Sequence, residues 1–99
     1  MARVQRQREQ RQRRLLLCPP DVAHPKDGLR ATAAQYLEWM EATGNSRTTV
    51  ASRVHNLRNF AEWCEERQLH RPMEVTRPVL ERYQRWLFHY RRADGRPLL

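Results

Sequence analysis

The sequence contains few cysteines and no long hydrophobic run. Its two cysteines lie far apart, Cys18 in a polar N-terminal segment and Cys64 on an apolar helical stripe, so we expect no disulfide and a reducing, cytoplasmic environment. The four histidines are scattered and show no metal-ligand spacing, so we expect no metal and no cofactor. No apolar segment approaches the roughly 20 residues that a membrane-spanning helix needs.

Lysine and acidic residues are also scarce relative to arginine. Eighteen of the 19 basic residues are arginine, against 11 acidic residues, which gives a formal net charge of +8. Guanidinium groups bind phosphates and base edges through paired hydrogen bonds. The composition therefore favours a nucleic-acid partner, and an anionic membrane surface is the next class of partner that such a charge suits. We expect neither membrane binding nor a small-molecule substrate.

The chain divides at about residue 26. Residues 1–14 are rich in arginine and glutamine without an apolar period, and residues 18–26 contain three prolines. We therefore expect residues 1–26 to form a disordered arm and an extended linker. Residues 27–99 show helical periodicity and no strand pattern, which predicts one all-α domain with three helices. The first helix should begin near residue 27 or 28 and end before Gly44.

The second predicted helix, residues 46–68, is the most clearly defined. Ser46 is a good N-cap, since its hydroxyl can accept the amide of Thr48 or Thr49. An apolar stripe follows at steps of four and three residues: Val50, Val54, Leu57, Ala61 and Cys64. The other side of its N-terminal half is basic and polar, which suits a phosphate backbone because the helix dipole and the unpaired amides add to the side chains. A merely solvated amphipathic helix is the alternative.

A third helix is predicted after Thr76, which is placed to cap it. Its apolar positions are Val79, Leu80, Tyr83, Trp86, Leu87 and Tyr90. The preceding connection, residues 69–75, should carry Leu69, Met73 and Val75 onto the core. The last residues, 93–97, read as a turn.

Two stretches have an order and spacing that together are distinctive. The first is Gly44-Asn45-Ser46-Arg47-Thr48-Thr49-Val50 followed by Leu57-Arg58-Asn59-Phe60-Ala61-Glu62-Trp63-Cys64-Glu65-Glu66-Arg67. The second is Glu74-Val75-Thr76-Arg77 followed by Leu80-Glu81-Arg82-Tyr83 and, later, Asp94-Gly95-Arg96-Pro97-Leu98. Over residues 27–99 the chain resembles the core-binding, SAM-like N-terminal domain of phage-integrase and Xer-type tyrosine recombinases.

This resemblance implies a small orthogonal helical bundle that forms one half of a clamp around the recombination-site duplex. At the helix start, the implied DNA-backbone contacts are Asn45, Ser46, Arg47, Thr48 and Thr49. Ser52, His55, Arg58 and Asn59 would lie further along the duplex. Arg53 stands where the family often has tyrosine, so a cation replaces an aromatic packing group. This change either strengthens phosphate contact, for which Arg53 is included among the candidate DNA-binding residues, or weakens the junction between the helices. The resemblance also implies a fourth helix beyond Leu99, so we expect the domain to be C-terminally incomplete.

The chemistry of the resembled family requires a catalytic domain with arginines, a lysine, a His-x-x-Arg element and a tyrosine nucleophile. The spacing His-x-x-Arg occurs at residues 55–58 and 89–92, but both lie in the predicted helices of the small domain, and we expect no catalytic domain in these 99 residues. Tyr36, Tyr83 and Tyr90 fall on predicted apolar faces, so we interpret them as core residues. We therefore expect this chain to have no catalytic activity, whereas the full-length parent would be a strand-exchange recombinase.

The predicted function is a DNA-binding module of a tyrosine recombinase or integrase. It would grip double-stranded DNA and, in the full-length protein, meet other recombinase protomers on the site. Two alternatives remain. One is an independent helix-turn-helix regulator, although the connection after Gln68 is longer than that motif uses. The other is an interaction module whose Arg-rich tail binds RNA or an acidic partner.

Overall fold

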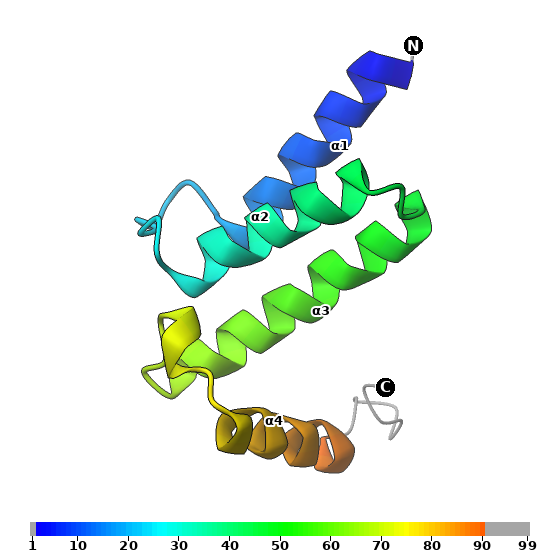
Figure 1. The fold of residues 1–99 in the computed structure, drawn as a ribbon. Helices are drawn as coiled ribbons and strands as arrows, with labels where there is room; N and C mark the ends of the chain where they lie inside the picture. Colours follow the sequence, from blue (N-terminus) through cyan, green and yellow to red (C-terminus); the bar gives the residue numbers. More distant parts are fainter. Residues whose placement is uncertain (1, 91–99) are drawn as a thin grey trace.

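The computed structural model describes residues 2–90, and the side chains of residues 4–90. This part of the chain holds four α-helices and no strand: α1 (Ala2–Leu17), α2 (Leu29–Ala42), α3 (Arg47–Glu66) and α4 (Arg77–His89), with a short 3-10 turn, η1 (Pro72–Glu74), before α4 (Figure 1). The prediction of an all-α fold is confirmed. The turn predicted at residues 93–97 lies outside the described residues.

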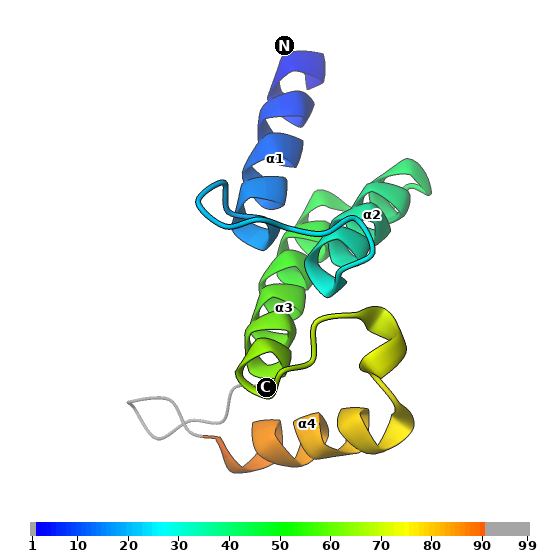
Figure 2. The same cartoon turned by 90° about the vertical axis from the view of Figure 1, so that its left-hand side faces the viewer.

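Helices α2 and α3 form an antiparallel pair, and they lie side by side in both views of the fold (Figures 1 and 2). The turn between them contains Gly44, whose φ of 88° lies in the left-handed region that favours glycine. Ser46 caps α3 as predicted, because its hydroxyl accepts a hydrogen bond from the Thr49 amide at 3.2 Å. Thr76 occupies the N-cap position of α4, but its side chain makes no capping hydrogen bond.

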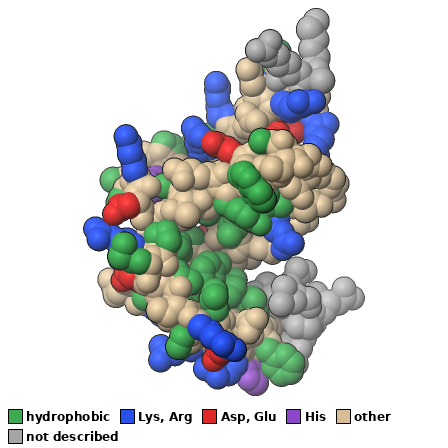
Figure 3. Space-filling model, in the orientation of Figure 1, with side chains coloured by type: hydrophobic (Ala, Val, Ile, Leu, Met, Phe, Trp, Pro, Cys, Tyr) green, Lys and Arg blue, Asp and Glu red, His purple; other side chains and the backbone are tan. Residues whose placement is uncertain are grey.

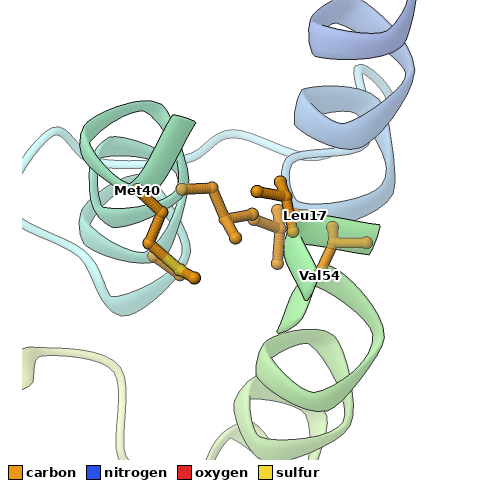
Figure 4. Packing of buried hydrophobic residues seen from close by; sticks show 6 residues of the cluster. Leu17, Met40 and Val54 are labelled. Atoms are coloured by element: carbon orange, nitrogen blue, oxygen red, sulfur yellow. The ribbon is translucent and has the colours of Figure 1, made fainter. Parts of the chain in front are cut away.

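Residues 2–17 differ from the prediction, because they form α1 and not a disordered arm. Arginine, glutamine, glutamate and leucine are all good helix formers. A helix of 16 residues is nevertheless marginal in isolation, so the stability of α1 depends on its packing against the other helices. Leu17 at its C-terminus is fully buried, and Figure 4 shows it between Met40 of α2 and Val54 of α3.

The hydrophobic core lies where α1, α2 and α3 meet. Its buried members are Leu17, Ala33, Leu37, Met40, Val50 and Val54. Arg30 of α2 closes one end of this core, because its guanidinium makes two hydrogen bonds to the Glu65 carboxylate, of 2.7 and 2.8 Å, and a third to the carbonyl oxygen of Leu17 at 2.8 Å. One side chain therefore joins all three helices.

Helix α4 is attached to the C-terminal half of α3 by aromatic side chains. The Tyr83 ring lies edge-on to Phe60 and Trp63, with ring centroids 4.7 and 5.1 Å apart. Trp63 was not part of the apolar stripe predicted for α3, but its side chain is buried. No residue of α4 is fully buried. Figure 3 shows hydrophobic side chains gathered on one face between the α2–α3 pair and α4, with arginine and lysine side chains around them.

Four predicted core positions are exposed, and one of them is Leu80 on the predicted stripe of α4, at 46%. Met73 is 78% exposed and lies in the 3-10 turn η1, none of whose residues is buried. Tyr36 and Tyr90 are 44% and 41% exposed. Both tyrosine rings contact an aromatic side chain close to them in the sequence: Tyr36 stacks on Trp39, and Tyr90 packs against Trp86.

Candidate nucleic-acid interface

The start of α3 presents several unpaired backbone amides at the positive end of a 20-residue helix. Ser46 and Thr49 are tied together there, because the Ser46 hydroxyl accepts the Thr49 amide and donates to the Thr49 hydroxyl at 2.9 Å. Asn45 closes the preceding turn, since its side-chain amide donates to the Met40 carbonyl oxygen at 2.8 Å. These residues therefore shape the helix start, and the amides around Arg47 remain open to an anion.

An exposed polar stripe runs from this helix start along α3. Its members recur at steps of four and three residues and are all exposed: Thr48, Ser52, His55 and Asn59. It lies opposite the buried stripe that contains Val50 and Val54. Hydroxyl, imidazole and amide groups can donate to phosphate oxygens or to base edges, so four of the predicted contact residues share one accessible face.

The three predicted arginines lie on the flanks of this stripe. Arg47 pairs with Glu9 of α1, with a 3.1 Å hydrogen bond from its Nε. Arg58 pairs with Glu62 one turn along α3, at 3.2 Å. Arg53 lies on the opposite flank from Arg47 and forms no ion pair within residues 4–90. The structure therefore does not bring all three guanidinium groups together on one side.

A groove between α1 and α3 borders the candidate interface, and the sequence reasoning missed it. Its volume is about 430 Å³. Its walls are Glu9, Gln12, Arg13 and Leu16 from α1 and Arg47, Thr48, Ala51, Val54 and His55 from α3. The only signal for it in the sequence was the absence of proline and glycine over residues 1–17, which permits a helix there.

The titratable groups with shifted pKa values have structural roles. Burial raises the pKa of the Cys64 thiol to about 11 and also raises the pKa of Tyr83. Hydrogen bonding to Arg30 lowers the pKa of the Glu65 carboxyl. Cys18 and Cys64 are both free thiols. None of these groups lies on the polar stripe of α3, whose side chains are suited to binding and not to covalent chemistry.

The described part of the chain offers no cluster of three or more histidine, cysteine, aspartate or glutamate side chains that could hold a metal ion. Over the same residues, every helix is too short or too polar to span a lipid bilayer.

Comparison with known proteins identifies a relative among the tyrosine recombinases. The chain is 51% identical over 63 residues to the tyrosine recombinase XerC 2 of Ralstonia nicotianae. The match covers 64% of this chain and 18% of the relative, so the chain spans less than a fifth of the length of the protein that it matches. No family model and no solved structure matches the chain. The predicted resemblance to tyrosine recombinases is confirmed by this identity, which does not itself identify the domain.

Proposed function

We propose that residues 27–99 are the core-binding domain of a tyrosine recombinase and that this domain grips the recombination-site duplex. The full-length protein would exchange DNA strands, act in the cytoplasm and meet other protomers on the site, whereas this domain would hold and position the DNA. The proposal draws on the similarity to a recombinase and on the geometry of α3.

The observation that carries the proposal is the start of α3. Open amides at the positive end of the helix are followed by the exposed stripe of Thr48, Ser52, His55 and Asn59. Such amides bind phosphate, and polar side chains along the next turns can fix register and contact base edges. Arginines on both flanks add the positive charge that a phosphate backbone requires.

The ion pairs of these arginines do not prevent such binding. The side chain of Arg47 is 64% exposed and that of Arg58 is 41% exposed. Exposed ion pairs contribute only about 0–1 kcal/mol, so a DNA phosphate can replace the carboxylate partner at little cost. Both guanidinium groups therefore remain available to the duplex.

The geometry of α2 and α3 argues against a helix-turn-helix formed by these two helices. The α2–α3 turn is short enough for that motif, but the motif sets its helices at roughly 90–120°. Helices α2 and α3 instead run antiparallel and side by side (Figures 1 and 2).

The experiment that tests the proposal is the salt dependence of binding to a mixed-sequence DNA duplex. Replacing Arg47 or Arg58 with alanine should weaken binding and flatten the slope of log K against log salt by about 0.9 for each phosphate that is no longer neutralised. Arg77 provides a matched control, because it forms the same type of i,i+4 pair, with Glu81 at 3.3 Å, on α4. Arg77→Ala should leave the slope unchanged. Equal effects of Arg58→Ala and Arg77→Ala would contradict a specific role for α3.

A further inference from the structure

Helix α1 carries positive charge that the fold leaves unneutralised. Its inner side is paired with acids: Arg13 meets Glu41 of α2 at 2.7 Å, and Arg14 pairs with Glu38. Its own acid, Glu9, pairs with Arg47 of α3. The remaining arginines with described side chains, Arg6, Arg8 and Arg11, are exposed and form no ion pair within residues 4–90.

These charges are held in a fixed place relative to α3. Burial of Leu17 and the hydrogen bond from Arg30 to its carbonyl oxygen anchor the C-terminus of α1. Figure 1 shows the N-terminal half of α1 projecting beyond α2 and α3. Arg8 and Arg11 are three residues apart and so lie about 4.5 Å apart along the helix axis. Both are exposed: Arg8 is one turn before Gln12, at the edge of the side of α1 that faces α3, whereas Arg11 lies with Arg14 and Glu38 on the side that faces α2.

The adjacent groove makes α1 continuous with the candidate interface. Glu9 and Gln12 of α1 face Thr48 and His55 of α3 across it. The partner suited to an array of unpaired guanidinium groups beside a helix start is a polyanion with regularly spaced phosphates. Duplex DNA bound at the start of α3 would bring such phosphates close to α1.

We propose that α1 is a second DNA-contacting element, in which Arg8 and Arg11 bind backbone phosphates of the duplex that α3 holds. This rests on the proposed function of α3. Phosphate contacts of this kind add affinity and salt dependence without reading sequence. The α1 contribution should therefore be the same for duplexes of different sequence.

The test compares two double variants that remove equal charge. Arg8→Gln/Arg11→Gln removes two arginines from α1, and glutamine keeps the helix propensity. Arg82→Gln/Arg85→Gln removes two exposed arginines with the same spacing from α4, where they too form no ion pair within residues 4–90. Binding of the whole chain to a mixed-sequence DNA duplex is measured against salt, with circular dichroism to confirm helix content.

The α1 variant should bind DNA more weakly than the parent chain. Its slope of log K against log salt should be reduced by about 1.8, or 0.9 for each of the two phosphates that it no longer neutralises. The α4 variant should keep the slope of the parent. Equal effects in both variants would mean that only total charge matters and would overturn the proposal. An unchanged slope in the α1 variant, while Arg47→Ala still reduces it, would overturn the role of α1 and leave that of α3 intact. Tighter binding to duplex RNA than to DNA would overturn the choice of partner.

Discussion

Replacing Leu17 with alanine tests the docking of α1, the largest difference between the fold and its prediction. Leu17 is 0% exposed and packs between α2 and α3. Truncating a buried leucine costs about 2–5 kcal/mol, because apolar packing is removed and a cavity remains. Leu15, two residues earlier on the same helix, is 46% exposed. Leu15→Ala makes the same chemical change and should cost less than about 0.5 kcal/mol.

Hydrogen exchange of the α1 backbone amides measures this difference directly. Since a helix of 16 residues is marginal alone, undocking of α1 should also melt it. Exchange within residues 4–17 should accelerate by at least roughly 30-fold in Leu17→Ala, the factor that 2 kcal/mol implies, while Leu15→Ala should resemble the parent. Equal and fast exchange in the parent and both variants would refute the docked helix.

Three further predictions concern single groups. Glu9→Gln should tighten binding to duplex DNA, by up to about fivefold, because it releases Arg47 from an exposed pair worth at most about 1 kcal/mol; an equal or weaker affinity in a binding titration would contradict this. The pKa of Glu65 is lowered in the folded chain by Arg30, so its stabilising contribution is complete above the ordinary carboxyl pKa and is lost as the pH falls through the lowered value. Melting curves against pH should therefore show a weaker loss of stability on acidification in Glu65→Gln than in the parent. Cys64 is fully buried with a pKa of about 11, so a thiol reagent at mildly alkaline pH should modify it only on unfolding; rapid labelling of Cys64 in the native chain would show that the α3–α4 junction opens.

The predictable parts of the fold were those that local chemistry decides. The start and end of α3 followed from the Ser46 cap and from a stripe of five apolar residues, and the turn before it followed from Gly44. The exposed face of α3 followed from the same periodicity. These features need no information from distant residues, because capping and amphipathicity act within a few turns.

The features that the sequence did not predict depend on contacts between residues far apart in the chain. Helix α1 has one fully buried anchor, Leu17, and it also contacts α2 through polar groups, among them the Arg13–Glu41 ion pair and the hydrogen bond from Gln10 to Glu41, so it shows no apolar period. Arg47 pairs with Glu9 from 38 residues away, which no local pattern reveals. Trp63 is buried because α4 places Tyr83 against it. Tertiary contacts of this kind override local propensity.

The most direct test of the proposed DNA grip is a map of the chain's own surface on binding DNA. Amide chemical shifts of the isotopically labelled chain are recorded while a mixed-sequence duplex is added. We expect the largest changes to fall on Arg47, Thr48 and Thr49, to continue through Ser52 and to extend to the exposed side of α1, while α4 changes little. Changes confined to α4, or an unchanged α3 start at saturating DNA, would contradict the grip by α3.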